Sequence, residues 1–146
     1  ILNKKKNQDL KYLNAINHSR SEWTYNYRKE LYNNYELIDA LEISKKHMLD
    51  LSKVLKENSI DLSIAIYPWP GTIRYDKVEN LQVKTWRDFC INNCNKFYNL
   101  MPYFFSKFEN ENFYENYKEL FIDNDFHFNE KGNEFLAENF LLLYNN

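Results

Sequence analysis

The chain has 146 residues, of which 44% are hydrophobic and 27% charged, values that fit one globular domain and exclude an intrinsically disordered chain. Its formal net charge of −2 gives no electrostatic reason to bind nucleic acid, and no apolar run approaches the roughly 20 residues that span a bilayer. Gly71 and Gly132 are the only glycines, so the glycine-rich loops that cradle nucleotide phosphates are excluded, and we expect no cofactor.

The first clear helix follows residues 1–34, which show little periodicity. Apolar residues at steps of three and four predict an amphipathic helix from about Tyr35 to Asn58. The run from Leu62 to Tyr67 is short and nearly continuously apolar, and the prolines that follow it indicate the end of a buried parallel strand. The pattern of the helix expected from Tyr35 to Asn58 depends on Leu37, Leu41, Met48, Leu51 and Leu55.

Helices and strands are expected to alternate along the rest of the chain. Residues 79–95 predict a helix, residues 96–102 ("KFYNLMP") a strand, residues 111–120 a helix, and a last helix begins at Asn129. This rhythm is typical of a doubly wound α/β layer. Because only two strands are convincing, we expect the later half of a larger parallel sheet. The last helix is expected to turn Phe135, Leu136, Phe140 and Leu143 inward.

Cys90 and Cys94 lie four residues apart in "DFCINNCNKF". A zinc site would need further ligands at suitable spacing, and none are present. Together with Val83, Trp86 and Phe97, the two cysteines form one face of the expected helix. We therefore expect free thiols that pack in the core as small hydrophobic groups.

The stretch "DNDFHFNEKGN" contains the most reactive combination of side chains. Asp123, Asp125 and His127 occupy alternating positions directly before the last helix, as in the calcium loop of an EF-hand. That loop needs glycine where Phe128 stands, and histidine is a poor ligand for calcium. A transition-metal site would need another histidine or cysteine close by, and no such ligand is near in the sequence.

A general base with an orienting carboxylate is a third interpretation of this stretch. In an extended segment, residues two apart face the same side, so Asp125 can hold Nδ1 of His127 and leave Nε2 to accept a proton. Asn129 can cap the following helix, and Gly132 leaves room for that helix to approach other backbone. The competing interpretation is a polar turn and helix cap without catalytic meaning.

The residues "DFHFNEKGN" resemble the last block of the SGNH (GDSL-type) hydrolases and acyltransferases, D-x-H-x-N-x-x-G-[HN]. The segments "IAIYPWP", "W-x-x-F-C" (Trp86 to Cys90) and "RSEWTYN" (Arg20 to Asn26) are also similar to segments of this family, though less specifically. The resemblance implies a flavodoxin-like three-layer fold and a Ser-His-Asp mechanism on esters. In it, His127 is the base and Asp125 its orienter. The resemblance also suggests an acylated carbohydrate as the substrate.

The family pattern also requires a serine in a G-D-S block and, later in the chain, a glycine and an asparagine for the oxyanion hole. None of these blocks is visible. Together with a chain that begins at Ile1 and not at Met, this indicates a single incomplete domain, residues 1–146, whose N-terminal half with the nucleophile is absent. Five serines are expected to be structural: Ser19, Ser21, Ser44, Ser52 and Ser63.

The loop after the first expected strand supplies two candidate substrate-binding residues. Ligands of open α/β sheets bind beyond the carboxyl ends of the strands, so this loop and the Asp125–His127 loop are expected to share one edge. There Trp69 can stack on a sugar ring or acyl chain, and Arg74 can hold a carboxylate or phosphate. Alternatively, the proline-rich loop only packs its own aromatic rings. A second hypothesis for the function is a non-catalytic interaction or carbohydrate-binding fragment that uses Trp69 and the tyrosines as its contact surface.

Overall fold

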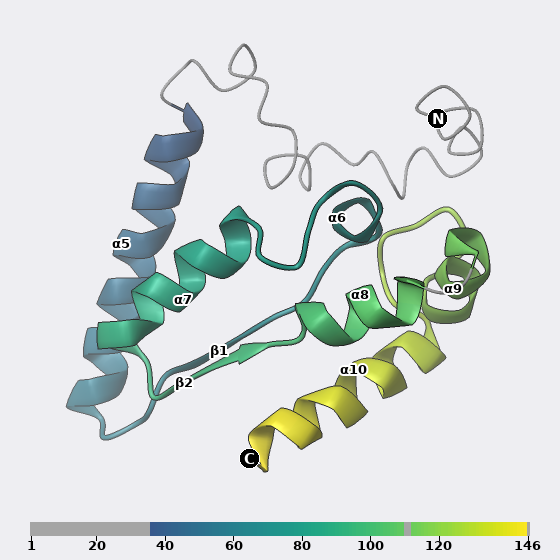
Figure 1. Ribbon diagram of the computed structural model, residues 1–146. Helices are drawn as coiled ribbons and strands as arrows, with labels where there is room; N and C mark the ends of the chain where they lie inside the picture. Colours follow the sequence, from purple (N-terminus) through teal and green to yellow (C-terminus); the bar gives the residue numbers. More distant parts are fainter. Residues whose placement is uncertain (1–35, 110–111, 146) are drawn as a thin grey trace.

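The computed structural model describes residues 36–109 and 112–145, which fold into a mixed, mostly helical α/β arrangement (Figure 1). Predictions that concern residues 1–35, including Ser19, Ser21 and "RSEWTYN", lie outside the described residues. The elements in chain order are α5 (Glu36–Glu57), β1 (Ser63–Ile66), α6 (Pro70–Tyr75), α7 (Leu81–Asn93), β2 (Lys96–Asn99), α8 (Met101–Glu109), α9 (Phe113–Leu120) and α10 (Glu130–Tyr144).

The sheet of the described residues has two parallel strands, in register from Ser63 opposite Lys96 to Ile66 opposite Asn99. Helices α7 and α10 lie on opposite sides of these strands (Figure 1). On the α7 side, Ile66 packs in one core cluster with Val83. On the α10 side, the ring of Tyr98 meets that of Phe140 at 5.0 Å between centroids. A parallel pair joined through helices thus forms the centre of the described structure, as predicted.

A second core cluster gathers α6, α8, α9 and α10 beyond the carboxyl ends of the strands. Its buried rings include Phe104 of α8 and Tyr117 of α9, and the inward residues of α10 pack against it as predicted. Phe104 stacks on Phe128 at 5.3 Å, and Phe121 meets the same ring at 4.8 Å. The segment between α9 and α10 is therefore anchored in the core by its aromatic residues.

Two helices were not expected from the sequence, and each has a proline as its first or second residue. Pro70 is the first residue of α6, where its fixed φ suits the first turn and its missing N–H is not needed. Pro102 is the second residue of α8, which replaces the end of the strand predicted over residues 96–102. The prolines that predicted strand ends therefore also lie in the first turns of new helices.

The prediction of free thiols at Cys90 and Cys94 is wrong, because the two residues form a disulfide with their Cα atoms 4.5 Å apart. Helix α7 ends at Asn93, and Cys94 caps it with extended backbone, from which its sulfur reaches back to Cys90. Phe97 lies on β2 and not on the predicted helix face. Cys90 is nevertheless buried, as expected.

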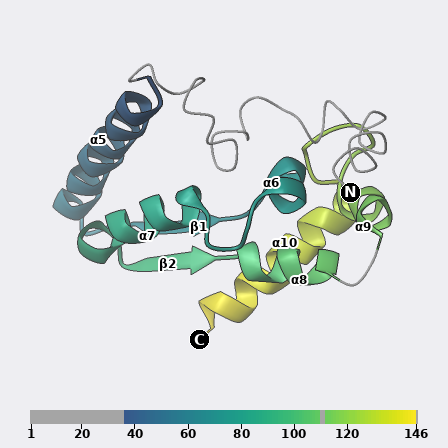
Figure 2. The same cartoon turned by 45° about the horizontal axis from the view of Figure 1, so that its top comes forward.

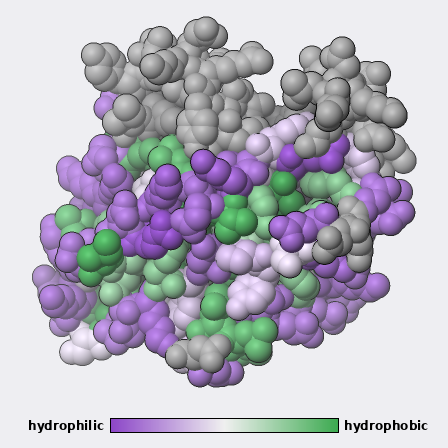
Figure 3. All heavy atoms as spheres, in the orientation of Figure 1, coloured by the Kyte–Doolittle hydropathy of each residue, from purple (hydrophilic) through white to green (hydrophobic). Residues whose placement is uncertain are grey.

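Helix α5 lies at the end of the molecule away from α9, and it contacts α7 (Figure 2). The Ser52 hydroxyl fixes this contact by donating to the carbonyl oxygen of Asn93 at 3.0 Å. On the face shown in Figure 3, hydrophobic residues form several patches separated by hydrophilic ones. No helix within the described ranges is long and apolar enough to cross a membrane.

Candidate active site

A tight turn directly after α9 presents the two candidate catalytic residues. Asp125 N–H donates to the carbonyl oxygen of Ile122 at 3.0 Å, and Ile122 N–H donates to the carbonyl oxygen of His127 at 3.0 Å. Asn124 has φ of 57°, the left-handed region that asparagine tolerates better than most residues. The chain therefore reverses within a few residues and runs back toward α10.

The turn brings the side chains of Asp125 and His127 together, as their spacing predicts. His127 Nδ1 lies 2.9 Å from Asp125 Oδ1. The same carboxylate oxygen accepts the backbone N–H of Phe126 at 2.6 Å and that of His127 at 3.2 Å. An ionised carboxylate can only accept, so Nδ1 carries the proton and Nε2 of the neutral ring is a free acceptor. The His127 side chain is 65% exposed, which leaves the imidazole accessible.

Burial raises the pKa of Asp125, but the hydrogen bonds from the His127 side chain and from two backbone N–H groups together outweigh it, so the pKa lies below its ordinary value. The carboxylate is consequently ionised at neutral pH. This charge is what would hold the Nδ1–H tautomer and stabilise an imidazolium if the ring accepted a proton.

We expect His127→Ala to raise the pKa of Asp125 toward its ordinary value of about 3.9, because the substitution removes a hydrogen bond to the ionised form. A lowered pKa adds stability above the ordinary pKa of the unfolded chain, and this stability is lost as the pH falls through the lower folded value. The stability difference between wild type and His127→Ala should therefore shrink below pH ~4. Carboxyl-carbon NMR titration measures the pKa, and His47→Ala, a change at an exposed histidine of α5, is the control.

Asn129 joins the end of α9 to the start of α10. Its side-chain oxygen accepts the N–H of Gly132 at 3.0 Å, which confirms the predicted helix cap. Its amide group also donates to carbonyl oxygens at the end of α9, at 3.0 Å for Glu119, 3.2 Å for Phe121 and 3.3 Å for Lys118. The amide therefore fixes both ends of the segment that carries Asp125 and His127.

Gly132 permits the close approach of α10 to the backbone at the end of α9. A Cβ at this position would lie 1.9 Å from the carbonyl oxygen of Leu120 and 2.9 Å from the ring of Phe128. The expectation that Gly132 leaves room for another backbone segment is confirmed.

The loop after β1 touches the Asp125–His127 loop through aromatic rings, so the two loops share one edge, as expected. Trp69 stacks on Phe126 with 4.8 Å between centroids, and Phe126 lies 4.2 Å from the His127 ring. Tyr67 meets Phe128 at 5.5 Å. Phe126 was not singled out from the sequence, although alternation along an extended segment turns it away from Asp125 and toward the protein. Trp69, Phe126 and His127 thus form a continuous row of rings.

Arg74 is not part of this row. Its guanidinium lies over the rings of Phe113 and Tyr114 of α9, 4.8 Å and 5.5 Å from their centroids. This half-buried position matches the alternative in which the proline-rich loop packs against the protein's own aromatic residues. The role of Arg74 in holding a carboxylate or phosphate stays a prediction.

Two described serines have structural partners, as expected. The Ser44 hydroxyl donates to the Ala40 carbonyl oxygen at 2.8 Å, and Ser52 binds Asn93 as described above.

Within residues 36–109 and 112–145, no three histidine, cysteine, aspartate or glutamate side chains are grouped in a way that could hold a metal ion. The geometry of the described residues therefore gives no support to the calcium or transition-metal interpretation.

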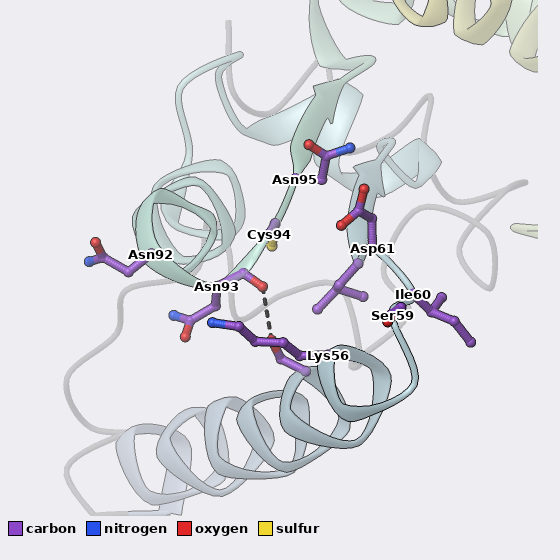
Figure 4. A pocket seen from close by; sticks show the side chains of 10 residues that line it. Lys56, Ser59, Ile60, Asp61, Asn92, Asn93, Cys94 and Asn95 are labelled. Carbon is purple, nitrogen blue, oxygen red and sulfur yellow. Dashed lines mark hydrogen bonds between the residues drawn. The ribbon is translucent and has the colours of Figure 1, made fainter.

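Two cavities lie outside the Asp125–His127 loop. One of about 520 Å³ adjoins the amino ends of both strands, and Figure 4 shows its polar lining, which comes from α5, the loop before β1 and the end of α7. Another, of about 220 Å³, lies between β1 and α10 and is lined mainly by apolar residues, among them Tyr67 and Phe140. Neither contains a residue that was predicted for the site.

Comparison with protein-family models, with curated proteins and with solved structures finds no match to this chain. The resemblance of "DFHFNEKGN" to the SGNH hydrolases is therefore untested by relatives, and the functional argument depends on the geometry of the site.

Proposed function

We propose that Asp125 and His127 are the acid and base members of a Ser-His-Asp catalytic triad, and that this chain is the C-terminal portion of an ester hydrolase or O-acyltransferase of the SGNH type. The observation that carries the proposal is the 2.9 Å hydrogen bond between Asp125 Oδ1 and Nδ1 of an exposed imidazole. A helix cap needs neither group, because Asn129 already caps α10.

In this mechanism the chain's own residues orient and move one proton. Asp125 holds the Nδ1–H tautomer of His127, so Nε2 can accept the proton of a nucleophilic hydroxyl as that oxygen attacks the ester carbonyl. The ionised Asp125 stabilises the imidazolium that results. His127 then returns the proton to the departing alcohol oxygen, and water or an acceptor hydroxyl completes hydrolysis or transfer by the same steps.

The nucleophile is the part that the described residues do not supply. We infer that residues 1–146 form one incomplete domain and that a missing N-terminal half carries the serine together with further strands of a flavodoxin-like sheet. Two features support this: the parallel sheet of the described residues has only two strands, and the hydroxyls of Ser44 and Ser52 are engaged with backbone carbonyl groups of helices. A two-stranded parallel sheet alone leaves much backbone without strand partners.

The row of rings beside His127 favours a substrate with an apolar or ring-shaped portion. Trp69 and Phe126 are both half-buried and stack 4.8 Å apart, so they offer a firm surface next to the imidazole. Such a surface suits the acyl chain or sugar ring of an acylated carbohydrate. The same row also supports the second candidate, a carbohydrate-binding fragment without catalysis, in which Trp69 and not His127 governs binding.

Turnover of a simple acetyl ester tests the proposal. We expect the 146-residue chain alone to show no turnover above that of buffer, because it lacks the nucleophile. In a longer product of the same gene that contains a G-D-S segment, we expect turnover that falls at least about a thousandfold in His127→Ala, since the general base is lost. The control is His47→Ala, which should leave turnover unchanged.

Either of two results would contradict this. Turnover by the 146-residue chain that His127→Ala abolishes would show that the nucleophile is present after all. Turnover by the longer protein that His127→Ala leaves intact would remove His127 from catalysis, and binding of carbohydrate that depends on Trp69 alone would then favour the second candidate.

A further inference from the structure

The hydroxyl of Tyr117 lies at the centre of the turn that carries Asp125. It accepts the N–H of Asp125 at 2.8 Å, and the Ile122 carbonyl oxygen shares this N–H at 3.0 Å. The hydroxyl also lies 2.7 Å from the carbonyl oxygen of Asp125 and 2.8 Å from that of Ile122. A phenol has one proton, so the two carbonyl oxygens share it. Both backbone polar groups of Asp125 are therefore tied to a single side-chain oxygen.

The ring that bears this hydroxyl is held firmly in the core. Tyr117 is fully buried, with 0% relative exposure. Its ring lies nearly parallel to those of Phe121 and Phe113, at interplanar angles of 10° and centroid distances of 5.5 Å and 6.4 Å. The hydroxyl thus fixes the position of the turn relative to helix α9, because the buried ring has no room to change its direction.

The tie to Tyr117 extends from Asp125 to His127. Ile122, whose carbonyl oxygen binds the phenol, donates its own N–H to the carbonyl oxygen of His127 at 3.0 Å. One turn therefore fixes the backbones of both Asp125 and His127. The Tyr117 hydroxyl in its centre holds that turn in place. Joining α9 to α10 does not require this arrangement, because Asn129 already performs that task.

We propose that Tyr117 is a positioning residue for the Asp125–His127 pair, setting the direction in which the carboxylate leaves the turn. The proposal rests on the function proposed above for that pair, although the geometry can be tested without turnover. Orientation of this kind matters because a carboxylate that drifts by an ångström no longer selects one histidine tautomer.

Tyr117→Phe in the 146-residue chain tests the proposal, since it removes only the hydroxyl. We expect the pKa of Asp125 in carboxyl-carbon NMR titration to rise toward about 3.9, because the N–H donors around the carboxylate lose their fixed geometry. The matched control is Tyr98→Phe, which removes the hydroxyl of another buried tyrosine, on β2. Both variants can lower the melting temperature, but only Tyr117→Phe should change the Asp125 titration.

An Asp125 titration in Tyr117→Phe that equals that of wild type would overturn the proposal and leave Tyr117 a purely structural residue. Amide exchange in the wild-type chain gives a second test that does not depend on a variant folding. We expect the Asp125 amide to exchange as slowly as the Phe121 amide, which is bonded to the Tyr117 carbonyl oxygen at 2.8 Å. Exchange at Asp125 that is tenfold or more faster would also overturn it.

The outcome is separable from that of the proposed function. A shifted Asp125 titration in Tyr117→Phe, together with a longer gene product that hydrolyses no ester, would keep the positioning role and refute the esterase.

Discussion

Gly132→Ala should lower the free energy of unfolding by about 2–4 kcal/mol, although alanine normally stabilises a helix by about 1 kcal/mol relative to glycine. The added methyl group would lie 1.9 Å from the Leu120 carbonyl oxygen, which is backbone and cannot rotate away. Relief requires α10 to move from the end of α9, and this movement would stretch the Asn129 hydrogen bonds. Chemical denaturation followed by circular dichroism measures the loss.

Lys131→Ala is the matched control for Gly132→Ala. Lys131 is exposed in the same first turn of α10, so we expect its replacement to change stability by no more than about 0.5 kcal/mol. If Gly132→Ala were as stable as Lys131→Ala, the close contact between α10 and Leu120 would not exist in the protein.

Elements with a clear period could be predicted from the sequence because local patterns determine them. Helix α5 follows from its leucine spacing, β1 from a short apolar run, and α10 from Asn129 as a cap followed by inward apolar residues. Helices α6 and α8 were missed because a proline can end a strand or lie in the first turn of a helix, and only tertiary context distinguishes these roles.

The sequence predicts which two side chains of the candidate site interact, but it does not predict all the residues that hold them in place. Asp125 and His127 are two residues apart, so their meeting depends on local geometry alone. Trp69 was expected at this edge because its loop follows a parallel strand. Tyr117 reaches the site from α9, and no local pattern says which of many aromatic residues will do so. The disulfide was not predicted for a related reason. The sequence pattern predicts a helix through residue 95, whereas the chain leaves the helix at Cys94.

These supports explain why a segment with few backbone hydrogen bonds of its own can hold two polar side chains in one geometry. The aromatic residues at alternate positions, Phe126 and Phe128, anchor the segment to the β1 loop and to the core. The remaining positions then project Asp125 and His127 away from the core. The geometry of the segment therefore depends both on the alternation of aromatic and polar residues and on tertiary packing, and only the alternation can be seen in the sequence.

Asn129→Asp should lower the free energy of unfolding at pH 7 by about 2–3 kcal/mol, even though aspartate is as good a helix cap as asparagine. The change keeps the oxygen that accepts the Gly132 N–H, but it replaces the amide group that donates to the carbonyl oxygens of Glu119 and Phe121. A negative charge would then face the carbonyl end of α9, where the helix dipole disfavours it.

Asn112→Asp provides the matched control, because Asn112 caps α9 through its oxygen, which accepts the Tyr114 N–H at 3.2 Å, and its side chain is exposed. We expect that variant to differ from wild type by no more than about 0.5 kcal/mol. The deficit of Asn129→Asp should also diminish when the introduced carboxyl is protonated at acid pH, since an O–H can again donate to α9. Equal stability of the two variants at pH 7 would mean that Asn129 acts only as a cap, and the coupling between α9 and α10 that holds the Asp125–His127 segment would need another source.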